Sequence, residues 1–530
     1  MKLISSKKYI VKMEIKKGYK KCSYSSILGV IGVTTLSAQQ PVKPKTDVQE
    51  RMNVLFIAVD DLKPTIGAYG DPHAITPNLD RIAREGFAFT YCYVQWAKSG
   101  PTRASLLTGM RPDKTKVWDL TTNFREINPN AVSLPQHLKA NGYETIVRGK
   151  VFHISAVEPG QDAPSWTYPY ERVTNYVGYV NKPATGKSPV SECVDVPDNT
   201  YQDGRLAEEG IRILQDFAKS GKPFFTAIGF NKPHLPFVAP KKYWDFYDRS
   251  KLSLAPFRQK AANSPDIAYH ISGELMDYGG IPKFDNYSED VRLHLPDDIQ
   301  LELIHAYYAC VSYMDAQVGK LLDELDRLGL ADNTIVILWG DHGWHLGDHG
   351  IWCKSTNFEQ ATRAPLLLRV PGIKGGVKPE TLCEFVDIFP TLCELTRTPI
   401  PSWLDGVSLV PVLTNPKISL REYALSQHSR PNRTMGYSIR TERYRYTEWI
   451  GGGYTAETPY EQAKIVGREL YDYLKDPLET RSLIDDKEYA QVQKMMKELF
   501  IKAMEREHVQ YVAYSARADW QIKPRQSDLK

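Results

Sequence analysis

The sequence predicts an α/β protein with a mostly parallel sheet sandwiched by helices, followed by a smaller α+β subdomain that contains a short antiparallel sheet. From residue 53 onward, short apolar runs of strand length alternate with helical patterns, which favours parallel βαβ units. Polar residues follow the carboxyl ends of several of these runs, at the edge where open α/β sheets bind ligands. After about residue 416 the pattern changes to closely spaced short strands and one helix. We therefore expect a main domain over residues 50–415 and a subdomain over residues 416–525.

The elements of the main domain are predicted from their length and their boundary residues. Residues 54–59 form an apolar run with β-branched side chains and have the length of a buried strand. The first expected helix, 77–85, begins after Thr76 as N-cap and stops at Gly86. The same reasoning predicts further strands at 144–147, 223–230, 334–339 and 365–370, and further helices at 134–141, 203–219 and 299–328.

The subdomain is expected to hold short strands at 437–439, 444–449 and 470–473, a glycine loop at 451–453 and a helix at 489–506. Two stretches of the main domain, 175–199 and 251–297, have weak periodicity and many Pro, Gly, Tyr and Asp residues. Long insertions of this kind often carry function, so we expect both to shape a substrate cleft.

The N-terminus predicts export. Residues 1–21 contain eight lysines, residues 26–36 are apolar, and the small residues Ser37 and Ala38 follow. This is the pattern of a signal peptide over residues 1–38, cleaved near Ala38, and it predicts a periplasmic or secreted protein. The apolar run is too short to span a bilayer, and no later run is long enough, so no membrane span is expected.

Composition excludes several classes of protein. The apolar fraction of 42% and the charged fraction of 25% are those of an ordinary globular protein. The formal net charge of +4 comes largely from the N-terminal lysines, so no nucleic-acid footprint is expected. The cysteines show neither a disulfide framework nor a CxxC metal site, and Cys310, in an apolar helical pattern, is expected to be a buried free thiol.

The first candidate site is the segment from Ser99 to Arg103 (SGPTR), which is followed by a short helix that ends at Gly109. A helix N-terminus favours a bound tetrahedral anion, and Arg103, one turn further on, can reach the same place. A nucleophile beside a guanidinium and an anion hole suits sulfuryl or phosphoryl transfer. Taken alone, the segment is better explained by Ser99 or Thr102 as an N-cap and Arg103 as a surface cation.

The second candidate site is a cation site. Asp60 and Asp61 follow the strand at 54–59, and Asp341 and His342 follow the strand at 334–339. Carboxylates that leave a buried strand are costly without a counter-charge. Three carboxylates and one imidazole favour a hard cation such as Ca²⁺ or Mg²⁺ over Zn²⁺. The alternative is that the two adjacent aspartates cap a helix.

Other residues carry little signal when taken singly. Lys150, His153, His234 and Lys354 belong to types that are more often ordinary core or surface residues than catalysts. His345 and His349 have the i, i+4 spacing of a zinc pair, but no HExxH pattern surrounds them and Gly347 between them weakens a helix, so zinc is not favoured.

Together these motifs form a known pattern. The chain from about Asn53 to Asp485 resembles the formylglycine-dependent sulfatases of the alkaline phosphatase-like superfamily, and within them the iduronate-2-sulfatase branch. Residues 99–103 with Leu107, Thr108 and Gly109 look like the C/S-x-P-x-R…LTG maturation motif. The other matching blocks are residues 149–153 (GKVFH), 232–237 (KPHLPF), 340–354 (from GDHGW to Lys354) and 469–477 (ELYDYLKDP).

The resemblance implies the alkaline phosphatase-like fold, with residues 50–415 as the catalytic domain, and hydrolysis of sulfate esters of carbohydrates. Ser99 would be oxidised to formylglycine, whose hydrate is the nucleophile, by a transient maturation enzyme of the radical-SAM type. The formylglycine would help to hold one Ca²⁺ ion. The other implied ligands are Asp60, Asp61, Asp341 and His342.

The resemblance also assigns roles to the remaining candidates. Arg103 and Lys150 would steady the formylglycine and the sulfate group. His153 would assist the proton movements of the hydrate. His234 and Lys354 would contact the sulfate ester and help to protonate the leaving alcohol.

Two positions depart from the most common family pattern: serine stands at the nucleophile position instead of cysteine, and Thr102 replaces the more usual serine. The substrate implied by the branch is a sulfated oligo- or polysaccharide, in the narrow version 2-O-sulfated uronic acid of glycosaminoglycans. Two alternatives stay open. One is a phosphodiesterase or phosphonate monoester hydrolase of the same superfamily, and the other is a non-catalytic polysaccharide-binding relative with an unmodified Ser99.

Overall fold

The computed structural model describes residues 51–157, 160–288 and 290–517. The predicted signal peptide lies outside the described residues. Within them, no helix combines the length and the apolar character that crossing a membrane requires.

The main domain is built on a six-stranded sheet with the order β2-β11-β8-β1-β6-β4. The four strands from β8 to β4 run parallel, whereas β11 is antiparallel to β8 and to β2. The mostly parallel sheet expected from the βαβ pattern is thus confirmed. The strands are β1 (Asn53–Val59), β2 (Phe87–Ala88), β4 (Glu144–Gly149), β6 (Phe224–Phe230), β8 (Thr334–Gly340) and β11 (Leu366–Arg369).

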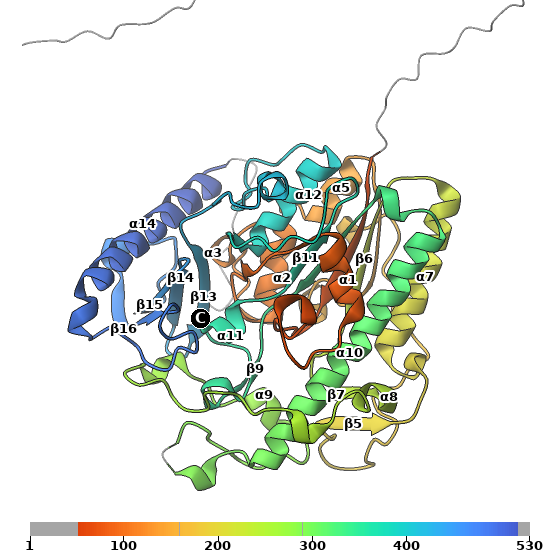
Figure 1. Ribbon diagram of the computed structural model, residues 1–530. Coiled ribbons are helices and arrows are strands. Elements are labelled where there is room, and N and C mark those ends of the chain that lie inside the picture. The colour runs from red at the N-terminus through yellow and green to blue at the C-terminus, as the bar shows by residue number, and fades with distance from the viewer. Residues whose placement is uncertain (1–50, 158–159, 289, 518–530) are drawn as a thin grey trace, which may run out of the picture. The chain divides into compact units, whose positions relative to one another are not determined.

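Helices cover both faces of this sheet (Figure 1). Alternate side chains of β1 enter two different cores, since Leu55, Ile57 and Val59 pack with α1, α7 and α10, while Val54, Phe56 and Ala58 pack with α2, α5 and α12. A strand buried on both faces explains why its sequence is continuously apolar. These helices are α1 (Pro77–Glu85), α2 (Ser99–Thr108), α5 (Leu134–Ala140), α7 (Gln202–Ser220), α10 (Asp297–Arg327) and α12 (Ile388–Thr396).

The C-terminal part forms an antiparallel four-stranded sheet covered by a long helix, α14 (Ala490–Ser515) (Figure 1). Tyr446 of the sheet packs against Phe500 of α14 with ring centroids 5.6 Å apart. The strands are β13 (Ala424–Arg430), β14 (Thr434–Arg440), β15 (Tyr444–Gly451) and β16 (Lys464–Asp472).

Most predicted elements match within one or two residues, and the differences lie mainly in the C-terminal part. Strand β13 was not predicted, because its sequence ALSQHSR has only two apolar residues and no alternation. Helix α14 runs beyond the predicted end at 506. Ser99 was expected to precede a helix but is its first residue, with Lys98 as the N-cap.

Candidate active site

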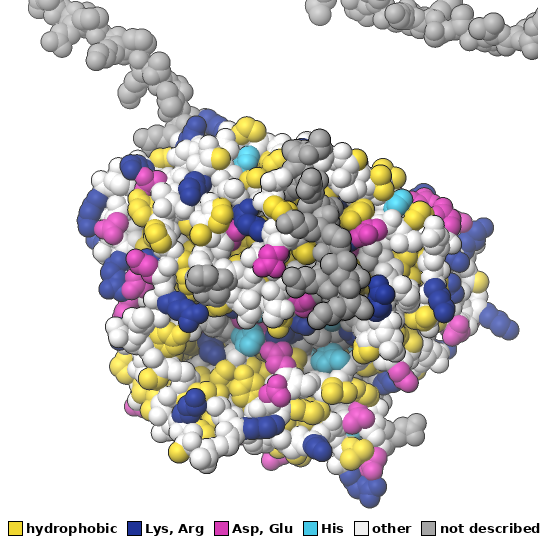
Figure 2. Space-filling view, turned by 180° about the vertical axis from the view of Figure 1, so that it is seen from behind, with side chains coloured by type: hydrophobic (Ala, Val, Ile, Leu, Met, Phe, Trp, Pro, Cys, Tyr) yellow, Lys and Arg dark blue, Asp and Glu magenta, His cyan; other side chains and the backbone are white. Residues whose placement is uncertain are grey.

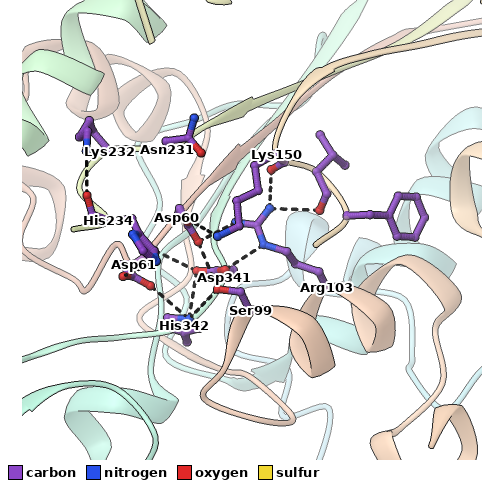
Figure 3. A network of polar contacts seen from close by, with 12 residues as sticks. Asp60, Asp61, Ser99, Arg103, Lys150, Asn231, Lys232, His234, Asp341 and His342 are labelled. Carbon is purple, nitrogen blue, oxygen red and sulfur yellow. Dashed lines mark hydrogen bonds and ion pairs between the residues drawn. The ribbon is translucent and has the colours of Figure 1, made fainter. Parts of the chain in front are cut away.

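The parallel register brings the ends of four strands to one edge of the sheet. Val59 of β1 lies opposite Gly340 of β8 and Phe230 of β6, and Gly149 of β4 lies opposite Gly229. The residues that follow these strands therefore meet. In Figure 3 they point toward one another, and they are Asp60, Asp61, Lys150, His234, Asp341 and His342.

A tight backbone contact fixes the end of β4. Gly149 has a φ of +74°, and a Cβ atom at this position would lie 2.1 Å from the carbonyl oxygen of Gly229. Only glycine fits both conditions. The chain therefore turns sharply here, and the next residue, Lys150, points its ammonium group at the carboxylate of Asp60.

Ser99 joins this group from the first turn of α2 and is only 3% exposed. Its Oγ lies 3.2 Å from Oδ1 of Asp60 and 3.2 Å from Nε2 of His342 (Figure 3). Its position at a helix N-terminus adds the positive end of the helix dipole. The structure thus brings the Ser99 hydroxyl, a possible nucleophile, into the predicted set of charged residues.

Arg103 holds two of the carboxylates together from the next turn of α2. Its Nε donates to Oδ2 of Asp341 at 2.9 Å, and its Nη2 donates to Oδ1 of Asp60 at 3.2 Å. Nη1 donates to the carbonyl oxygens of Lys150 and Val151. The side chain is fully buried, so this guanidinium is a structural centre of the site as well as a positive charge in it.

The carboxylates of Asp60 and Asp61 differ in electrostatic state although both are buried. Burial alone would raise the pKa of Asp60, but Lys150, His234 and Arg103 lower it well below its usual value. Burial raises the pKa of Asp61 well above its usual value, because Lys354 does not offset the added repulsion from Asp60, Glu274 and Asp341. The side chains of the chain itself therefore leave Asp61 short of positive charge.

The site fits a bound cation at Asp61. The Nδ1 of His342 lies 2.9 Å from the carbonyl oxygen of Gly343, which places the proton on Nδ1 and leaves Nε2 with a lone pair. That Nε2 lies 3.3 Å from Oδ1 of Asp61 and 3.5 Å from Oδ1 of Asp341. The ligand atoms of these three buried residues all lie within 4.8 Å of one another. The lone pairs of these ligand atoms converge, and too few protons lie between them to form hydrogen bonds, so the arrangement suits a metal ion. Because most of the ligand atoms are oxygens, a hard cation such as Ca²⁺ or Mg²⁺ fits best.

A second group of possible ligands shares Asp61 with the first and adds His234 and Glu274. Here the positive charge is already present, because Nζ of Lys354 lies 3.0 Å from both carboxylate oxygens of Asp61 and 3.0 Å from Oε1 of Glu274. An ammonium in this place disfavours a second metal ion. The geometry therefore favours one cation site, not two.

His153 stands apart from the direct contacts. Together with Asp60, Lys150 and His234 it lines a cavity of about 390 Å³ that also touches Tyr176 and Tyr179. Burial, and then Lys150, lower the pKa of His153 to about 4, so the imidazole is neutral at physiological pH. On the face shown in Figure 2, histidine, acidic and basic side chains gather around a hollow.

Sequence reasoning missed Glu274 and the tyrosines of the cavity. Glu274 lies on the short helix α9 (Gly273–Met276) within the stretch 251–297, and Tyr176 and Tyr179 lie within 175–199. Both stretches were predicted to shape a cleft, but a single acidic or aromatic residue in an aperiodic segment gives no signal of its own. By contrast, Nε2 of His345 contacts Oγ1 of Thr356, and Nε2 of His349 contacts the carbonyl oxygen of Glu479, as expected for residues of the core.

Comparisons with known proteins find relatives over most of the chain. The family model described as Sulfatase matches residues 52–398, and the model of the N-sulphoglucosamine sulphohydrolase C-terminal region matches residues 347–506. The iduronate 2-sulfatase of Mus musculus is 33% identical, over 89% of this chain and 97% of the mouse protein.

Solved structures show the same fold. A structure described as a complex with its substrate D-glucosamine-2-N,6-O-disulfate aligns with a TM-score of 0.68 at 22% identity, covering 87% of this chain and 98% of the other. The phosphonate monoester hydrolase of Agrobacterium radiobacter aligns with a TM-score of 0.67 at 21% identity, covering 90% and 100%. The fold alone therefore does not separate sulfuryl from phosphoryl chemistry.

Proposed function

The chain belongs to the sulfatase family and is a sulfuric ester hydrolase, and we propose that it removes sulfate from carbohydrates, with 2-O-sulfated uronic acid in glycosaminoglycans as its substrate class. The substrate class is taken from the relationship to iduronate 2-sulfatase. The observation that best supports this chemistry is the position of Ser99. Its Oγ lies 3.2 Å from both Asp60 and His342, at the N-terminus of the helix that also contains Arg103.

The proposed nucleophile is made from Ser99. A two-electron oxidation of its CH₂–OH group by a radical-SAM maturation enzyme gives the aldehyde of formylglycine, and water adds to give the hydrate. One hydroxyl oxygen of the hydrate attacks sulfur, and the S–O bond to the sugar breaks as the alcohol leaves. The second hydroxyl then loses its proton, the carbonyl reforms, and sulfate is expelled. A serine that kept its alcohol lacks this last route.

Asp60, Asp61, Asp341, His342 and the modified Ser99 are the proposed ligands of one Ca²⁺ ion. When bound, this ion supplies positive charge for the sulfate group and the nucleophile. The preference for a hard cation is supported by the converging donor set of Asp61, Asp341 and His342, in which two of the three ligands are carboxylates.

The remaining groups serve binding and proton transfer. Arg103, held by Asp60 and Asp341, and Lys150 steady the nucleophile and the sulfate oxygens. The neutral imidazole of His153 is suited to accept a proton from the hydrate. His234 and Lys354 contact the bridging oxygen and protonate the leaving alcohol, whose expulsion as an alkoxide would be slow.

We further propose that residues 50–415 form the catalytic domain and 416–525 the C-terminal subdomain, and that the protein acts after export to the periplasm or the medium. The phosphodiesterase or phosphonate hydrolase alternative is supported only by the shared fold. The single cation site, with Lys354 in the place of a second ion, weighs against a two-metal version of it.

The test is sulfate release from a panel of sulfated disaccharides and polymers. The Ser99→Cys variant is co-expressed with a cysteine-type formylglycine-generating enzyme, and the aldehyde content of the residue-99 peptide is measured by mass. Release by the aldehyde-bearing protein, and none by the same variant without the maturation enzyme, is the expected result. Release of phosphate from phosphodiesters, with no sulfate release despite a confirmed aldehyde, would contradict the proposal.

A further inference from the structure

Glu274 lies between a lysine and a histidine of the site. Its Oε1 lies 3.0 Å from Nζ of Lys354 and 3.2 Å from Nε2 of His234, so one oxygen bridges the two groups. Its side chain is 33% exposed, whereas that of Asp61, the other partner of Lys354, is fully buried. The carboxylate of Glu274 is therefore the solvent-accessible partner of Lys354.

Lys354 has a second carboxylate partner besides Glu274. Both carboxylate oxygens of Asp61 already lie 3.0 Å from its Nζ. Burial alone would raise the pKa of Glu274, yet Lys354 and His234 lower it to about 2, so a full negative charge lies beside these two groups.

We propose that Glu274 is a selectivity residue that favours monoanionic sulfate esters over dianionic phosphate monoesters. This inference rests on the proposed function, in which His234 and Lys354 contact the ester. An ester that enters must share these two groups with the carboxylate or displace it. A sulfate monoester brings one negative charge, whereas a phosphate monoester brings nearly two at neutral pH because its second pKa is about 6. Glu274 repels the added charge of the phosphate ester. Even in water, two like unit charges about 4 Å apart weaken a binding constant by a factor of about five.

The chain offers a matched control on the same helix end. Asp277 is the C-cap of α9, three residues after Glu274, and its side chain is exposed. The substitutions Glu274→Gln and Asp277→Asn each remove one negative charge and keep the shape of the side chain. Only the first removes a charge that touches Lys354 and His234.

The experiment measures binding, so that it does not depend on turnover. In a Ser99→Ala background, the dissociation constants of 4-nitrophenyl sulfate and 4-nitrophenyl phosphate are measured at pH 8 by NMR titration of the full-length protein. We expect Glu274→Gln to tighten binding of the phosphate ester about tenfold more than binding of the sulfate ester, and Asp277→Asn to leave the ratio unchanged. Equal changes for the two esters, or no binding of either ester to any variant, would overturn the inference.

Failure of the proposed function looks different from failure of this inference. If the aldehyde-bearing protein releases no sulfate but Glu274→Gln still shifts the binding ratio, the function is wrong and the role of Glu274 stands. If sulfate is released and the ratio does not move, the function stands and Glu274 is not a selectivity residue.

Discussion

Two clusters of buried charge in this molecule look alike in composition but differ in how their donor atoms are arranged. The sheet-edge cluster consists of Asp60, Asp61, Ser99, Arg103, Asp341 and His342. The joint cluster links α11 (Glu359–Thr362) to the C-terminal sheet and consists of Tyr93, Glu359, Arg440, Arg445, Tyr473 and Glu479. In the joint cluster, Nη2 of Arg445 lies 2.6 Å from Glu359, Nε of Arg445 lies 3.2 Å from Glu479, and Nε of Arg440 lies 3.2 Å from Glu359.

The difference shows which property marks a functional site. In the joint cluster two arginines face two glutamates, and although burial raises the pKa of Glu359, Arg440 and Arg445 bring it down to about 2. In the sheet-edge cluster the pKa of Asp61 stays well above its usual value. Buried charge by itself is common to both clusters. The joint cluster also contains a carboxyl group with a raised pKa, because burial of Glu479 outweighs the charge of Arg445. What sets the sheet edge apart is that Asp61 lies in a group of converging possible metal ligands, with the hydroxyl of Ser99 close by.

The largest expected effect concerns the nucleophile. Ser99→Ala should lower sulfate release by at least about a thousandfold, because no other group can form the covalent intermediate. Ser105→Ala, in the same helix and also buried, is the matched control and should keep activity within a few-fold of the parent. The measurement is the initial rate of sulfate release from the substrate identified in the panel. If the Ser99→Ala protein kept a tenth of the parent rate, the sheet-edge cluster would not be the catalytic site.

The next effect concerns stability in the joint cluster. Glu359→Gln should lower the free energy of unfolding by about 3–5 kcal/mol, because it leaves Arg440 and Arg445 buried with too little negative charge. Activity per folded molecule should stay near that of the parent. Denaturant unfolding with parallel assays gives both quantities, and a stable but inactive variant would contradict the structural role.

The third effect is a pair of opposite pH dependences. The folded pKa of Glu359, about 2, lies below the unfolded value, so its contribution to stability is present above about pH 4.5 and is lost as the pH falls toward 2. Burial raises the pKa of Asp203 to about 6, although it accepts hydrogen bonds from the backbone amides of Asn231 and Lys232. Its contribution is therefore present below about pH 4 and is lost as the pH rises through 6.

Unfolding of Asp203→Asn and Glu359→Gln across pH 3–8 measures this contrast. Relative to the parent, Asp203→Asn should gain stability between pH 4 and 7, by up to about 3 kcal/mol, whereas the deficit of Glu359→Gln should shrink below pH 4. Parallel pH curves for the parent and both variants would show that neither carboxyl group is perturbed as described.

The sequence was sufficient to predict the sheet and the residues at its edge, because both depend on local patterns. A doubly buried strand is a short apolar run, and parallel strands align their carboxyl ends, so Asp60 and Asp341 could be placed together without knowledge of the strand order. The contacts of Arg103 with both carboxylates were not predicted, because Arg103 reaches them from helix α2 and not from a strand of the sheet.

Glu274 and the joint cluster could not be predicted, because they depend on long-range packing. Glu274 reaches Lys354 across 80 residues of chain, and Arg445 reaches Glu359 across 86. No local period or motif surrounds these residues. Strand β13 was missed for a related reason, since its polar side chains find partners in other parts of the fold, as when Oγ of Ser426 donates to the carbonyl oxygen of Val94.

The account is tested most directly by Asp61→Asn, measured for sulfate release and for thermal unfolding with and without Ca²⁺. We expect activity to fall at least about a thousandfold, the cation-free protein to unfold at the same temperature as the parent or higher, and the stabilisation by Ca²⁺ to disappear. This outcome would place the uncompensated carboxylate at the centre of the site. A variant that keeps activity and Ca²⁺ stabilisation, or one that only loses stability as Glu359→Gln does, would contradict it.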